Sequence, residues 1–124
     1  MWIPRYRYKL FNVSSATISP QTIEIEFENK ETTKSTGSTN GTWLTHPAFT
    51  FGTDEINGIW VGKFETTGSS STPTVKPGIA TLSGLNITQQ FNAVKNFNNA
   101  TTYGLNNKFD AHMMKNIEWG ATVY

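Results

Sequence analysis

The hydrophobic pattern of this chain starts with period-two alternation and ends with helical spacing. The clearest alternation lies in residues 22–28, where glutamates separate three apolar side chains. The apolar positions are Ile23, Ile25 and Phe27. This pattern predicts an antiparallel strand with one face on the core and the glutamates in solvent.

Residues 2–13 predict a second strand with the same division between its faces. Tyr6 and Tyr8 fall on the face expected to be buried. The other face is basic and consists of Arg5, Arg7 and Lys9. We expect these cations to be solvated and to pair with the glutamates of residues 22–28 across neighbouring strands. A phosphate or glycan contact is the alternative role.

Residues 58–66 predict the central strand of the fold. Apolar side chains occupy both of its alternating faces, with Trp60 and Phe64 on one of them. A strand that is apolar on both faces is usually interior, so we expect Trp60 and Phe64 to be buried. Gly62 predicts a bulge or a close backbone approach, because it has no side chain to pack.

Polar segments flank the predicted strands. Residues 29–42 and 66–77 are dominated by Ser, Thr and Gly or Asn and predict exposed loops, with Asn40-Gly41 as a turn dipeptide. His46 follows the first of these loops and precedes a proline, which favours extended backbone. We expect His46 to make a structural hydrogen bond. A metal ligand or general base is the alternative, but no nucleophile adjoins it.

The last third of the chain shows helical spacing. Asn86 or Thr88 is expected to cap a helix over residues 87–99, and Gly104 to end this segment in a left-handed conformation. The apolar stripe of this helix, expected to face the core, consists of Ile87, Phe91, Val94 and Phe97.

A second helix is predicted from Asp110, as its N-cap, to the end of the chain. Met113 and Met114 are expected to fill the core in its first turn. Glu118 is expected to form a salt bridge or a helix-to-strand hydrogen bond. Because the chain stops inside this helix, we expect it to be a truncated piece of a longer protein.

Together these elements predict a single α+β domain over residues 1–124, with an antiparallel sheet packed on two helices. The length of 124 residues is typical of one domain. Aromatic residues make up 13% of the chain, and their large rings help to build a core from few apolar positions.

Charge and cysteine content exclude several classes of function. Ten basic and nine acidic residues give a net charge of +1, which provides no basis for binding nucleic acid or a membrane surface. The absence of cysteine excludes disulfides, thiolate catalysis and Cys-based metal sites. No apolar run approaches the ~20 residues of a membrane-spanning helix, so we expect no membrane insertion.

Four short motifs carry a resemblance to known proteins. They are Trp-Ile-Pro-Arg-Tyr at 2–6, His-Pro-Ala-Phe at 46–49, Gly-Ile-Trp-Val-Gly-Lys-Phe-Glu at 58–65 and Met-Met-Lys-Asn-Ile-Glu-Trp-Gly-Ala at 113–121. These motifs resemble uncharacterised tail-fibre, receptor-binding or pilus-associated surface proteins of Gram-positive gut bacteria and their phages. More distantly, their order is similar to the formylglycine-generating-enzyme branch of the C-type lectin fold. Because that family's oxidase chemistry requires cysteines, the resemblance implies a shared fold used for binding without the activity.

We therefore predict a non-catalytic structural and recognition module of a phage virion or bacterial surface, of the tail-fibre or receptor-binding type. It would assemble with other copies or with other virion or surface proteins, because a short sheet has unpaired edges and the aromatic content exceeds what a small core needs. The alternatives are a carbohydrate-binding module and a pilus-associated surface domain. Exposed aromatic side chains would contact a host-surface glycan or protein, and the candidates are Trp2, Tyr6, Trp43 and Tyr103.

No catalytic residue, metal-ligand set or cofactor motif is predicted. Glycan hydrolysis, a third possibility, would use Glu65 or Glu118 together with Asp54. It requires two carboxylates about 5–10 Å apart across a cleft, and these acids are dispersed along the sequence. The turn around Asp54 also lacks the full spacing of a calcium-binding loop.

Overall fold

The computed structural model describes residues 1–10, 22–104 and 109–124. The last part of the predicted strand 2–13 and the predicted connection at 14–21 lie outside the described residues. Contacts divide the chain into two units, which we describe separately. The terminal unit comprises Trp2–Val61 and Lys115–Tyr124, and the inserted unit comprises Gly62–Met114 together with Met1.

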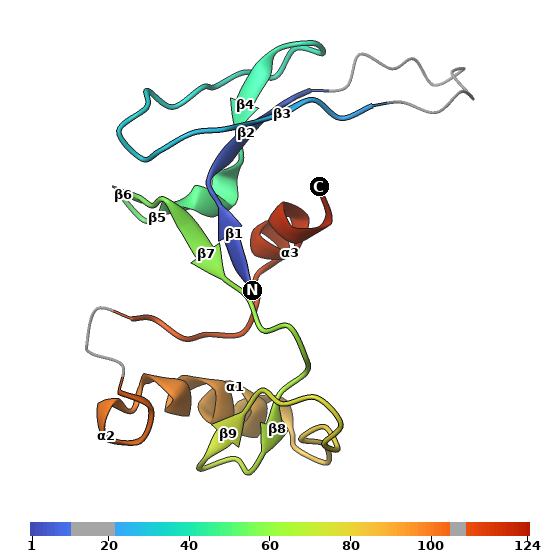
Figure 1. The fold of residues 1–124 in the computed structure, drawn as a ribbon, viewed down its shortest axis with the longest axis vertical. Helices are drawn as coiled ribbons and strands as arrows, with labels where there is room; N and C mark the ends of the chain where they lie inside the picture. Colours follow the sequence, from blue (N-terminus) through green and yellow to red (C-terminus); the bar gives the residue numbers. More distant parts are fainter. Residues whose placement is uncertain (11–21, 105–108) are drawn as a thin grey trace. The chain divides into compact units, whose positions relative to one another are not determined.

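The terminal unit contains short antiparallel strands (Figure 1). β2 (Tyr6–Lys9) lies between β3 (Ile25–Phe27) and β4 (Trp43–Thr45), and β1 (Trp2–Pro4) pairs with β7 (Gly58–Trp60). A small hairpin consists of β5 (Thr50–Phe51) and β6 (Asp54–Glu55). The 3-10 helix η1 (Pro47–Phe49) precedes this hairpin, and α3 (Asn116–Val123) packs against η1.

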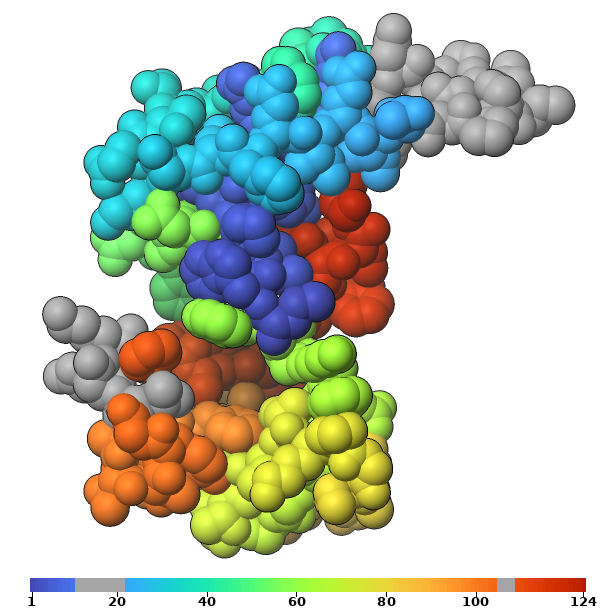
Figure 2. Space-filling model, in the orientation of Figure 1, coloured from blue at the N-terminus to red at the C-terminus, as the bar shows by residue number. Residues whose placement is uncertain are grey.

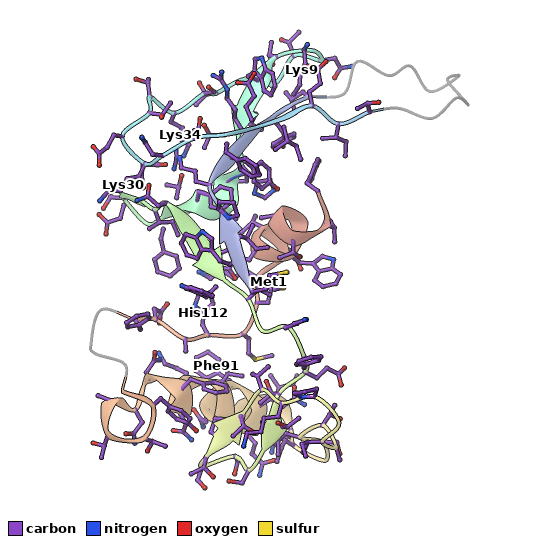
Figure 3. The ribbon with its side chains drawn as sticks, viewed as in Figure 1. Met1, Lys9, Lys30, Lys34, Phe91 and His112 are labelled. Atoms are coloured by element: carbon purple, nitrogen blue, oxygen red, sulfur yellow. The ribbon has the colours of Figure 1, made fainter. Side chains whose placement is uncertain are left out.

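The predicted pairing of basic and acidic strand faces is confirmed. Arg7 lies opposite Glu26 in the register of β2 and β3, and Arg7 Nη2 is 2.5 Å from Glu26 Oε2. Lys9, labelled in Figure 3, places its Nζ atom 2.8 Å from Glu24 Oε2. Because both pairs are partly exposed to solvent, each contributes less than about 1 kcal/mol to stability.

The core of the terminal unit is built around β2, η1 and α3. Its buried apolar side chains are Tyr6, Tyr8, Ala48, Phe49 and Ala121. The predicted inward face of β2 is thus confirmed. Ile23 and Ile25 pack against this core as predicted. Phe27 does not, because it lies at the end of the edge strand β3 and is 74% exposed.

The prediction of an interior strand at residues 58–66 is wrong. The strand ends at Trp60 and pairs with β1 in a two-stranded ribbon. Trp60 is 73% exposed and Phe64 is 42% exposed. A ribbon of two short strands has too little structure around it to bury apolar side chains on both faces.

The inserted unit contains a β-hairpin followed by helices (Figure 1). The hairpin consists of β8 (Thr67–Gly68) and β9 (Pro73–Thr74). The predicted exposed loop 66–77 is therefore partly wrong, because Thr67 and Pro73 are buried. The helical part consists of α1 (Ile87–Lys95), the 3-10 helix η2 (Asn96–Asn98) and α2 (Ala100–Tyr103).

The predicted cap at Asn86 and stop at Gly104 are confirmed, but the predicted helix over residues 87–99 is wrong in its extent, because α1 ends at Lys95. Its predicted apolar stripe is only partly buried, since Val94 and Phe97 are half-buried and the other two residues are exposed. Asn86 Oδ1 accepts the Gln89 N–H at 2.9 Å, and the Gln89 side chain accepts the Asn86 N–H, forming a capping box. Gly104, with φ of 70°, ends α2. Ile87 is 78% exposed, and Phe91, which Figure 3 shows on α1, is 48% exposed.

α3 begins later than the sequence predicts. Its first helical residue is Asn116, so the predicted N-cap at Asp110 is wrong. Met113 and Met114 precede the helix and are each 41% exposed, so they do not fill the core. The Glu118 carboxylate accepts the Lys115 N–H at 2.8 Å and thereby satisfies an amide at the start of the helix.

At the level of class the α+β prediction is confirmed. The described residues form a small mixed fold with several antiparallel sheets and three α-helices. Within the described part of the chain, no helix has both the length and the apolar character needed to cross a bilayer.

Candidate functional site

Two tryptophans meet on the exposed ribbon of β1 and β7. Trp2 and Trp60 are direct partners in the antiparallel register, and their ring centroids are 5.3 Å apart at an interplanar angle of 53°. Trp2 is 42% exposed and Trp60 is 73% exposed. Residues of the N-terminal strand, coloured blue, are visible at the surface in Figure 2. We call this pair of rings the indole platform.

Gly58 allows the indole platform to form. A Cβ atom at Gly58 would collide with the six-membered ring of Trp2 and with the Ile3 carbonyl oxygen. The Trp2 ring therefore lies against the backbone of the neighbouring strand, where any larger residue would displace it. This contact holds one indole in place while the other stands beside it.

The four aromatic residues predicted to bind a ligand have different surroundings. Trp2 is exposed, as expected. Tyr6 is 3% exposed and donates its hydroxyl to the Ala121 carbonyl oxygen at 3.1 Å, so its expected exposure is wrong. Trp43 is half-buried and carries the Arg7 guanidinium 5.1 Å and the Lys9 ammonium 5.8 Å from its ring centroid. These cations occupy the surroundings of the indole that a sugar ring would need.

Tyr103 belongs to the inserted unit and is also engaged within it. Its hydroxyl donates to the Pro73 carbonyl oxygen at 2.7 Å, and its ring centroid lies 5.2 Å from that of Phe97. Within the terminal unit, the structure does not gather Trp2, Tyr6 and Trp43 into one exposed site. It pairs Trp2 with Trp60, which the sequence assigned to the core. The glycines that flank residues 59–61 were the available signal that this strand is short.

A buried ion cluster lies at the junction of β1 and β2. Arg5 is 0% exposed, and its Nε atom is 2.9 Å from Glu28 Oε1. Its Nη1 atom donates to the Glu55 carboxylate and, at 3.3 Å, to the Phe49 carbonyl oxygen. One guanidinium thus joins three segments that are far apart in the sequence.

The prediction that Arg5 lies on the solvated face with Arg7 and Lys9 is wrong. Arg5 falls between the two strands, so the alternation of β2 does not set the direction of its side chain. Its backbone N–H donates to the Asn57 carbonyl oxygen at 2.8 Å, and its carbonyl accepts the Glu28 N–H at 3.1 Å. The chain is therefore bonded to different segments on the two sides of Arg5, which encloses the side chain.

Glu55 is the more accessible carboxylate of this cluster. Although partial burial opposes the change, hydrogen bonds from Arg5 and Thr50 lower the pKa of Glu55 below its ordinary value. Lys34 Nζ lies 3.5 Å from Glu55 Oε1 and adds a second cation. Because the charges of Arg5 and Lys34 are balanced by those of the two glutamates, we infer that the cluster has a structural role and connects these segments.

The acids considered for glycan hydrolysis have separate environments. Glu118 is 7% exposed, Asp54 is exposed in β6, and Glu65 is exposed in the inserted unit. An open groove of about 530 Å³ in the inserted unit has Glu65 as the one carboxylate among its lining residues. A groove of about 400 Å³ in the terminal unit is lined by Glu26 and Glu28, each of which binds an arginine. Neither groove presents the unengaged carboxylate pair that this chemistry requires.

Within the described ranges, no cluster of three or more His, Cys, Asp or Glu side chains is placed to hold a metal ion. No protein-family model matches the chain, and the comparisons with curated proteins and with solved structures give no significant match. The likeness to the C-type lectin fold therefore stays a prediction from short motifs.

Proposed function

We propose that this chain is a non-catalytic recognition module of a phage virion or bacterial surface, which assembles with other copies and contacts its partner through the indole platform. The observation that carries the proposal is the contact between two exposed tryptophans, Trp2 and Trp60, on paired strands. Tryptophan is among the residues most enriched in the energetic centres of protein interfaces.

The energetics of exposure support this function. An indole left in water forgoes the transfer free energy that burial would provide, which amounts to roughly 1.5–3 kcal/mol for a large apolar side chain. Two adjacent indoles form a contiguous apolar surface, whereas isolated apolar residues on a surface are common and need no explanation. A partner that covers both rings would recover this free energy.

Carbohydrate binding is the second candidate, and the close approach of the Trp2 ring to Gly58 favours it. An indole that lies against backbone and is 42% exposed offers a preordered surface on which a pyranose can stack. Stacking on an aromatic face needs no charged group on the protein. This alternative shares the platform with the assembly function, so the experiment must separate the two.

The test compares Trp60→Ala with the control Trp119→Ala, which removes an exposed indole (60% exposed) from α3. Light scattering over a concentration series should show self-association of the wild type and of Trp119→Ala, and a weaker association of Trp60→Ala. A glycan array with the same three proteins reports on the alternative. A strictly monomeric wild type that also binds no glycan would refute both functions.

A further inference from the structure

His46 is a buried titratable residue at the start of η1. Its side chain is enclosed, with 4% of the residue exposed. Its Nδ1 atom accepts the backbone N–H of Ala48 at 3.3 Å and thereby caps the short helix. The expected structural hydrogen bond is thus present.

Aromatic rings surround the imidazole. Its ring centroid lies 5.4–6.0 Å from four others, which belong to Tyr6, Tyr8, Phe49 and Tyr124. The backbone of α3 closes the remaining side, because a Cβ atom at Gly120 would stand 3.5 Å from His46 Nε2. His46 therefore contacts β2, η1 and the C-terminal helix together.

The hydrogen bond to Ala48 determines where a second proton would go. Since Nδ1 is an acceptor, the neutral ring carries its proton on Nε2. Protonation would then place a hydrogen on Nδ1, where it would face the N–H of Ala48. The cap would be lost, and a positive charge would stand among four rings.

Few groups around His46 would compensate that charge. The titratable groups in contact with it are the tyrosines of β2 and Tyr124. In the described part of the same unit, the buried charged side chains are Arg5, Glu28 and Glu118. Arg5 is neutralised by Glu28 and Glu55, and Glu118 accepts the Lys115 N–H. Among the described residues no carboxylate lies within ion-pair distance of His46. Burial accordingly lowers the pKa of His46 below its ordinary value.

We propose that His46 is an acid-sensitive latch, and that its protonation releases α3 (Asn116–Val123) from β2 and η1. In the docked state the imidazole is neutral and caps η1. In the released state it is solvated and takes up a proton readily. Release breaks the contacts of His46 with Gly120 and Tyr124, and also the hydrogen bond from the Tyr6 hydroxyl to the Ala121 carbonyl oxygen.

The direction of the pH dependence follows from linkage. The released state binds the His46 proton more tightly than the docked state, so falling pH favours release. The effect should begin near the ordinary imidazole pKa of about 6.5 and increase by up to about tenfold per pH unit. It should level off once the docked state is itself protonated.

The test follows the wild-type chain by NMR from pH 8 to pH 4.5. The two histidine side chains report their midpoints, and amide hydrogen exchange, corrected for its intrinsic pH dependence, reports opening of α3. We expect a His46 midpoint below 6.5, with protection of α3 falling roughly tenfold per pH unit while β2 and β4 stay protected. A midpoint at or above 6.5 would overturn the latch, as would equal loss of protection in all three elements.

A pair of variants isolates the proton itself. His46→Asn keeps a capping acceptor but cannot titrate, and His112→Asn removes the other histidine, which lies in the inserted unit. We expect α3 to stay docked at pH 5 in His46→Asn and to open in His112→Asn as in the wild type. Acid opening of α3 in His46→Asn would contradict the proposal. If that variant does not fold, the wild-type titration alone decides.

Discussion

Each unit of this chain is stabilised internally by a different kind of interaction. In the described part of the terminal unit, five apolar side chains form a buried core, and segments far apart in sequence are in contact, as in the hydrogen bond from the Tyr6 hydroxyl to Ala121. Among the described residues of the inserted unit, the buried apolar side chains are Ala93 and Pro73. Larger apolar residues such as Ile87 and Phe91 stay exposed.

The two units obtain their stability from different sources. The terminal unit depends on burial and on charges paired across long sequence separations, so single changes there should have large effects. The inserted unit relies to a greater extent on caps and turns, such as the Asn86–Gln89 capping box and the Ser69–Thr72 turn. Interactions of this kind contribute about 1 kcal/mol each.

The sharpest contrast concerns two phenylalanines. Phe49→Ala removes a ring that is 0% exposed and should reduce the unfolding free energy of the terminal unit by about 4 kcal/mol. Phe91→Ala, at 48% exposure on α1, should cost less than about 1 kcal/mol. Urea denaturation followed by circular dichroism measures both. Similar losses would remove the distinction between the units.

The buried arginine should matter far more than its exposed neighbour. Arg5→Leu leaves Glu28 buried without its cation and should destabilise the terminal unit by about 3 kcal/mol. The loss of stability is smaller than for a fully hydrogen-bonded pair, because Arg5 Nη2 and Glu28 Oε2 have no hydrogen-bond partner among the described residues. Arg7→Leu, the matched control, should cost under about 1 kcal/mol. Equal denaturation midpoints for the two variants would contradict the structural role of the cluster.

Acid should weaken the terminal unit in a second window, below that of His46. The pKa of Glu55 is lowered in the folded state, so its contribution is present above the ordinary glutamate value and is lost as the pH falls through the folded value. Glu55→Gln should therefore destabilise the protein by about 1 kcal/mol at neutral pH and flatten the stability curve below about pH 4.5. Glu65→Gln in the inserted unit is the control. An unchanged acid dependence in Glu55→Gln would exclude this explanation.

The smallest effect concerns the cap of α1. Asn86→Ala removes the acceptor of the capping box and should lower the protection of α1 amides by about 1 kcal/mol. Asn92→Ala makes the same replacement at an exposed position inside the helix, where alanine is the better helix former. Hydrogen exchange should distinguish the two. A loss confined to Asn92→Ala would show that α1 is not limited by its cap.

Parts of the fold and little of the candidate site were predictable from the sequence. The alternation of residues 22–28 predicted the strand and its ion pairs with Arg7 and Lys9, and both are present. Trp2 was expected to be exposed and is. Trp60, its partner in the indole platform, was assigned to the core because its predicted strand is apolar on both faces. That pattern does not determine how many strands surround the predicted strand.

Several local features of this protein follow from its sequence alone, namely the inward face of β2, the cap at Asn86 and the stop at Gly104. These follow from backbone geometry and from hydrogen bonds between near neighbours, which a short stretch of residues specifies completely. Tertiary structure alone decided the burial of Arg5, the exposure of Trp60 and the enclosure of His46. Burial depends on which distant segments cover a residue, and the periodicity of one segment carries no information about those segments.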